Sequence, residues 1–83
     1  MPYAILLRPA TVRDLKGLAG DIRERIELAI DRLADNPRPP GSRKLVGFQN
    51  EWRIRIADYR VLYVIDYRAR QVVIARIAHR REA

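Results

Sequence analysis

The segment 52–63 holds the residues whose types and spacing are best suited to chemistry. It reads Trp-Arg-Ile-Arg-Ile-Ala-Asp-Tyr-Arg-Val-Leu-Tyr, so Arg53 and Arg55 alternate with apolar residues. A period of two is typical of a strand with one buried face, and it leaves both arginines on the opposite face. Residues 57–58 allow a tight reversal into a second strand, on which Arg60 would join them. Three guanidinium groups on one small sheet repel each other unless an anion binds there, and a nucleic-acid backbone is the natural candidate.

The positive charge of the chain is unevenly distributed. The net charge is +7, and 15 of the 17 basic residues are arginine. Residues 1–40 include seven basic and six acidic residues, whereas residues 41–83 include ten basic and four acidic ones. The positive field therefore belongs to the C-terminal half, where it would attract an anionic partner in a salt-dependent way. Charge alone would also fit a soluble surface from a genome that favours arginine.

Length and composition exclude several classes of protein. The 83 residues, 48% hydrophobic and 33% charged, predict a single globular domain over 1–83. With no cysteine and one histidine, neither a disulfide framework nor a metal site is expected, and no cofactor is implied. No apolar run approaches the roughly 20 residues of a membrane span, and the N-terminus lacks the pattern of a signal peptide. We therefore expect a cytoplasmic protein with no membrane partner.

The spacing of apolar residues predicts a strand, two helices and then three or four strands. Possible capping boxes open the helices, Thr11 with Asp14 and Asp21 with Glu24. A stiff linker, 38–42, leads to the late strands. The predicted strands are residues 3–8, 44–46, 51–56, 59–67 and 71–78. The predicted inward residues of the helices are Val12, Leu15, Leu18, Ala19, Ile22, Ile26, Ala29, Ile30 and Leu33.

These elements predict an α+β fold in the order β-α-α-β-β-β(-β). Short loops between the late strands require antiparallel hairpins, so the sheet is mostly antiparallel. The two N-terminal helices must pack on one face of that sheet to bury their apolar stripes. Residues 59–67 carry apolar side chains at both odd and even positions, which point to opposite faces of the sheet. This pattern predicts a central strand covered on both faces. The arginine-bearing face would be left open.

Several blocks of the sequence together resemble the RelE branch of the RelE/ParE toxin superfamily. They are Lys44-Leu45, Trp-Arg-Ile-Arg-Ile at 52–56, Asp-Tyr-Arg-Val-Leu-Tyr at 58–63 and Ile-Ala-His-Arg-Arg at 77–81. The resemblance covers nearly the whole chain, including the order of helices and strands. It implies a RelE/ParE-like fold and a toxin of a type II toxin–antitoxin system.

The resemblance also implies an activity and a set of partners. RelE-like toxins enter the ribosomal A site and cleave the messenger RNA there, when the ribose 2′-OH attacks the adjacent phosphate. The expected partners are a cognate antitoxin, the ribosome with its mRNA, and operator DNA only through the antitoxin complex. Such an mRNA interferase would inhibit translation.

The family's basic positions fall on specific residues of this chain. The two on the middle strand correspond to Arg53 and Arg55, the one opening the next strand to Arg60, and the one after the last strand to Arg80. His79 stands beside Arg80, and its ordinary pKa near neutrality makes it the candidate proton carrier. Further RNA contacts are expected from Lys44, Arg76 and Arg81.

The arginines have a structural interpretation as well as a functional one. Arg53 and Arg55 would also suit the solvated face of an edge strand, and Arg60 could pair with Asp58 or Glu51. Arg80 and His79 lie near a terminus, where solvated side chains are common.

One departure from the family pattern leaves other functions open. RelE-like chains usually continue to a tyrosine, whereas this sequence reaches Ala83 without it, so we expect a shortened tail or a weakened toxin. The alternatives are a ParE-like poison of DNA gyrase, or a non-enzymatic toxin that acts with its antitoxin in repression.

Overall fold

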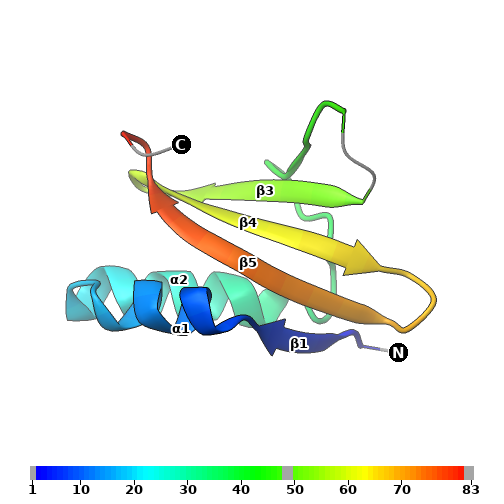
Figure 1. Ribbon diagram of the computed structural model, residues 1–83, viewed down its shortest axis with the longest axis horizontal. Coiled ribbons are helices and arrows are strands. Elements are labelled where there is room, and N and C mark those ends of the chain that lie inside the picture. The colour runs from blue at the N-terminus through cyan, green and yellow to red at the C-terminus, as the bar shows by residue number, and fades with distance from the viewer. Residues whose placement is uncertain (1, 48–49, 82–83) are drawn as a thin grey trace.

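The fold is a five-stranded sheet with both helices packed on one of its faces (Figure 1). The structure, a computed structural model, describes residues 2–47 and 50–81. No helix in these residues is long and apolar enough to cross a membrane. The helices are α1 (Pro9–Lys16) and α2 (Gly20–Arg32). The strands are β1 (Ala4–Leu7), β2 (Arg43–Lys44), β3 (Glu51–Ile56), β4 (Tyr59–Asp66) and β5 (Gln71–His79).

The strand order β1-β5-β4-β3-β2 places β4 at the centre of the sheet. β2, β3, β4 and β5 pair antiparallel with their neighbours, and only β1 runs parallel to its partner, β5. The β3–β4 reversal is as short as predicted, because Ile56 pairs with Tyr59 and Ala57 adopts a positive φ of 53°. The predicted α+β fold with a mostly antiparallel sheet is confirmed.

One face of the sheet forms the hydrophobic core with the helices. The alternation predicted for β3 is confirmed, since Ile54 is buried, and the buried residues of β4 are Val61, Tyr63 and Ile65. The helices contribute Leu15, Ile26, Ile30 and Leu33 to the same cluster. Burying a side chain of this size is worth about 1.5–3 kcal/mol, so the core fixes which face of each strand turns inward.

A bulge changes which residues of β5 reach that core. Leu62 pairs with Arg76 but Tyr63 pairs with Ile74, so β5 has one extra residue at this point. Ile74 and Ile77, three residues apart, are both buried as a result. A strict period of two could not place both on one face.

The predicted capping boxes are wrong, because α1 and α2 both begin before the residues expected to cap them. Neither N-cap, Arg8 for α1 or Ala19 for α2, makes a side-chain capping hydrogen bond. Thr11 lies inside α1, where its hydroxyl donates to the Ile74 carbonyl oxygen at 2.7 Å. The Asp14 carboxylate accepts the Ile77 backbone N–H at 2.9 Å. These polar contacts fasten α1 along β5.

Two further expectations about burial are also corrected. Val12 and Ala19, predicted to point inward, are exposed. The inner face of α1 is occupied by Thr11 and Leu15, and Ala19 is the N-cap of α2, outside the helix. β4 is covered on the helix side only, since Leu62 and Val64 on its other face are half-buried. That second face has no helix over it.

The linker before β2 is attached to the core by Tyr63. The Tyr63 hydroxyl donates to the Pro37 carbonyl oxygen at 2.7 Å, although the ring is only 1% exposed. Burial raises the pKa of this hydroxyl from 10.0 to about 12. The chain then turns at Gly41, whose φ of +90° suits glycine, and enters β2. Tyr63 therefore helps to set where β2 meets the sheet.

Replacing Tyr63 by phenylalanine removes this hydrogen bond while keeping the ring. We expect the Tyr63→Phe variant to lose about 0.5–1.5 kcal/mol of unfolding free energy at neutral pH, measured by urea denaturation. Tyr67→Phe is the matched control, because Tyr67 is 41% exposed. Equal losses in the two variants would contradict an anchoring role for Tyr63.

The raised pKa of Tyr63 also predicts a pH dependence of stability. The unfolded state releases this proton near pH 10 and the folded state only near pH 12, so stability is intact below pH 10 and falls as the pH rises to about 12. Wild-type protein should lose on the order of 2 kcal/mol across this window that Tyr63→Phe does not lose. Parallel alkaline profiles of the two proteins would refute the assignment.

Candidate functional site

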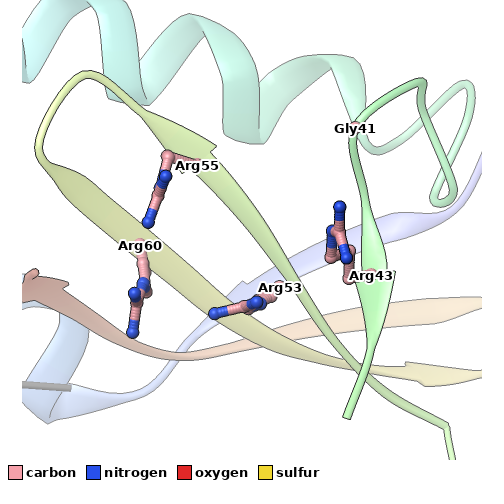
Figure 2. A pocket seen from close by; sticks show the side chains of 5 residues that line it. All are labelled: Gly41, Arg43, Arg53, Arg55 and Arg60. Atoms are coloured by element: carbon pink, nitrogen blue, oxygen red, sulfur yellow. The ribbon is translucent and has the colours of Figure 1, made fainter.

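Four arginines line one pocket on the helix-free face of the sheet. The pocket has a volume of about 300 Å³ and is lined by Gly41, Arg43, Arg53, Arg55 and Arg60. Figure 2 shows the side chains of Arg53, Arg55 and Arg60 directed toward a common space. Arg43 lies on the neighbouring strand β2, across β3 from Arg60. The gathering of the three predicted arginines follows from the burial of Ile54 and Val61 on the other face.

The register of the strands places these arginines opposite one another in pairs. Arg55 pairs with Arg60 across β3 and β4, and Arg43 pairs with Arg53 across β2 and β3. Like charges directly opposite on a sheet are destabilising. Among residues 2–47 and 50–81, the ion pairs join Arg76 to Asp14 and Arg80 to Asp58, so neither involves the pocket. The pocket therefore holds concentrated positive charge.

Arg60, the cationic residue of β4, is partly enclosed by the structure. It is half-buried, and its Nε is shielded from solvent with no hydrogen-bond partner in the described structure. The predicted alternative of a pair with Asp58 or Glu51 is not seen, because Asp58 pairs with Arg80 instead. A buried donor without a partner is costly, and an anion in the pocket could accept from it.

Two other predicted site residues are engaged by carboxylates outside the pocket. Arg76 Nε donates to the Asp14 carboxylate of α1 at 3.0 Å. Arg80 lies beyond the end of β5, where its guanidinium is 3.8 Å from the Asp58 carboxylate. The structure does not place either residue in the lining of the arginine pocket.

His79 lies on the opposite side of the sheet from the arginines. It pairs with Tyr59 across β4 and β5, and the two rings meet edge to face at 5.2 Å. Tyr59 packs against the core, whereas its neighbour Arg60 faces the pocket. The structure therefore separates the predicted proton carrier from Arg53, Arg55 and Arg60.

The remaining predicted contacts also lie apart from the pocket. Lys44 pairs with Trp52, which packs against the core, so its side chain is on the helix side of the sheet. Arg81 is exposed after β5, and its backbone N–H donates to His79 Nδ1 at 3.3 Å. The expected departure from the family pattern falls at Ala83, which lies outside the described residues.

Arg43 is a pocket residue that the sequence reasoning missed. Its strand is only two residues long, and pairing with Arg53 is what places Arg43 on the helix-free face. The basic pair Arg43-Lys44, at the start of the predicted strand 44–46, was the signal in the sequence that could have indicated Arg43. Two residues are too few for alternation to show which face each side chain occupies.

The pocket can bind anions but offers no ordinary proton carrier. Arginine remains protonated in proteins, and its planar fork can donate two hydrogen bonds to a phosphate. A repeating anion, with charges spaced along a chain, could use both arginine pairs. The geometry is therefore suited to hold a polyphosphate backbone and to stabilise negative charge that develops on it.

Comparison with known proteins identifies relatives of this chain. The family model for the ParE toxin of type II toxin–antitoxin systems matches residues 5–83. Toxin RelE3 of Methanocaldococcus jannaschii is 31% identical over 81 residues, which cover 93% of this chain and 90% of that protein. The predicted resemblance to RelE toxins is thus confirmed at the level of sequence.

Solved structures show the same fold. The RelE–RelB complex from the archaeon Pyrococcus horikoshii contains a chain that matches with a TM-score of 0.87 and 26% identity, with full coverage of both chains. A free E. coli RelE mutant matches with a TM-score of 0.85 at 18% identity, covering 100% of this chain and 88% of that one. The sequence and structural relatives agree: the chain belongs to the ParE toxin family of type II toxin–antitoxin systems, in the RelE branch of the RelE/ParE superfamily.

Proposed function

We propose that this toxin is a ribosome-dependent endoribonuclease that cleaves messenger RNA and so inhibits translation. The observation that carries the proposal is the pocket lined by four arginines on an uncovered sheet face. A messenger RNA strand is a single-stranded polyanion, and positive grooves that follow the backbone are typical of proteins that bind such strands. The family membership supports the same activity.

In the proposed reaction the ribose 2′-OH attacks the adjacent phosphate. The new bond gives a 2′,3′-cyclic phosphate, and the bond to the next nucleotide breaks. The 2′-OH proton passes to water or a group of the ribosome, and the departing oxygen takes up a proton from the same source to leave a 5′-OH. Negative charge gathers on the phosphate oxygens in the transition state, where Arg53, Arg55 and Arg60 would donate hydrogen bonds. Fixed cations accelerate such a step when they bind the transition state more strongly than the ground state.

The ribosome would provide what this pocket lacks. The lining residues are four arginines and one glycine, so none of them exchanges a proton near neutral pH. Cleavage also requires the 2′-OH and the leaving oxygen to lie nearly in line, and a ribosome could hold the RNA in that geometry. We therefore expect the isolated protein to be a poor ribonuclease.

A cognate antitoxin is the proposed protein partner. The structural relatives include toxin–antitoxin complexes of RelE with RelB. For this chain, an antitoxin segment with an acidic, amphipathic character would mask the arginine face and lie across the sheet and helices. Contact with operator DNA would then occur through the complex.

Arg60 is the first residue to test, because its Nε is shielded and has no partner in the described structure. We expect Arg60→Gln to lower the rate of mRNA cleavage by about 10²–10³, measured in single turnover on ribosomes with a defined A-site codon. Arg25→Gln on the exposed side of α2 removes the same charge and should keep the wild-type rate.

Mapping of mRNA ends in cells expressing the chain distinguishes this function from its rivals. Cuts within codons that disappear in Arg60→Gln would support the proposal. Growth arrest with intact messages and loss of DNA supercoiling would instead indicate a gyrase poison. A chain that neither arrests growth nor cuts RNA, but represses with its antitoxin, would indicate a non-enzymatic toxin.

Arg55 offers a test of the repulsion within the pocket. Because Arg55 is directly opposite Arg60, Arg55→Gln should raise the unfolding free energy by roughly 0.2–1 kcal/mol while lowering cleavage. The gain should shrink in about 1 M salt, where charges are screened within roughly 3 Å. Urea denaturation at low and high salt measures the gain in unfolding free energy and its decrease with salt. A loss of stability in Arg55→Gln would contradict the assigned repulsion.

A further inference from the structure

Arg43 extends the proposed RNA site beyond the three arginines of β3 and β4. It is one of the five residues that line the pocket, and it pairs directly with Arg53. Arg43 is exposed and is not part of the ion pairs in residues 2–47 and 50–81. Its charge is therefore available to a ligand on this face.

The position of Arg43 is built by contacts far from it in the sequence. The Tyr63 hydroxyl holds the Pro37 carbonyl oxygen, and the turn at Gly41 directs the chain into β2. After β2, the Leu45 backbone N–H donates to the Glu51 carbonyl oxygen at 2.8 Å. The segment that carries Arg43 is thus attached to the sheet on both sides, so less order has to be gained when a ligand binds.

Strand geometry separates Arg43 from Arg60. The two residues stand two strands apart, and Arg43 is in register with Arg53 while Arg60 is in register with Arg55. Neighbouring strands are about 4.8 Å apart and alternate residues about 6.7 Å, so the backbones of Arg43 and Arg60 are about 12 Å apart. One phosphate group is small compared with this distance.

We propose that Arg43, with Arg53, binds the phosphate next to the one that is cleaved. The inference rests on the proposed RNA-cleaving function of the pocket. In this arrangement Arg55 and Arg60 hold the reacting phosphate, and the Arg43–Arg53 pair holds its neighbour along the strand. Arg43 fixes the register of the RNA in the site and takes no part in the bond changes, so it is a positioning residue.

Binding of an RNA that cannot be cleaved tests the proposal separately from the activity. The probe is a short single-stranded oligoribonucleotide with 2′-deoxyribose at the cleavage position, labelled for fluorescence anisotropy. Arg43→Gln should weaken its binding roughly tenfold. It should also reduce the slope of log affinity against log salt by about 0.7, the contribution of one single-strand phosphate contact.

Two variants of the same short strand serve as controls. Lys44→Gln removes one positive charge from the adjacent residue, whose side chain is on the other face of the sheet. It should change the salt slope by less than half as much as Arg43→Gln does. Arg43→Lys keeps the charge without the fork, so it should restore the slope but only part of the affinity.

Cleavage on ribosomes then separates positioning from chemistry. For Arg43→Gln we expect the toxin concentration at half-maximal rate to rise roughly tenfold, with the maximal rate within about threefold of wild type. Unchanged probe binding, equal effects of Arg43→Gln and Lys44→Gln, or a maximal rate that falls as in Arg60→Gln would each overturn the proposal. If the wild-type chain cuts no mRNA, the function fails while the binding and salt-slope data still decide the role of Arg43.

Discussion

The burial of one face of β3 and β4 holds the arginines of the other face together. Ile54 stands between Arg53 and Arg55, and Val61 follows Arg60, so inward apolar residues and outward cations are neighbours in the chain. Each buried aliphatic side chain contributes about 1.5–3 kcal/mol, whereas a directly opposed like-charge pair costs roughly 0.2–1 kcal/mol. The hydrophobic term is larger. The sheet therefore keeps its register and retains the repulsion.

This retained repulsion would favour the binding of an anion at the proposed site. A pocket that was neutralised by carboxylates of its own chain would have to lose those contacts before a phosphate could bind. Here the acidic partners Asp14 and Asp58 lie outside the pocket, and Arg60 Nε has no partner in the described structure. The arginines are thus already held together by the folded chain, and a bound anion would reduce the repulsion among them.

Sequence alone predicted the parts of the fold and site that depend on local pattern. Alternation placed Arg53, Arg55 and Arg60 on one face, because the period of a strand is a property of consecutive residues. It could not place Arg43, since β2 has two residues and its register depends on the turn at Gly41 and on the distant Tyr63. The face of His79 could not be predicted for a related reason: it follows from pairing with Tyr59 after a bulge in β5.

Thr11 and Asp14 show how tertiary contacts override a local signal, and Asp14 also binds one of the predicted RNA contacts, Arg76. Their types and spacing match a helix cap, yet both bind the backbone of β5, which is some 60 residues away in sequence. Asp14 is only 19% exposed and binds both Arg76 and the Ile77 N–H, so an RNA phosphate would compete poorly for Arg76.

The Arg80–Asp58 pair differs, because its side chains are 58% and 61% exposed and 3.8 Å apart. Exposed pairs of this kind are worth about 0–1 kcal/mol, so a phosphate with more than one charge-assisted hydrogen bond could displace Asp58. Under the proposed function, RNA would therefore recruit Arg80 more readily than Arg76.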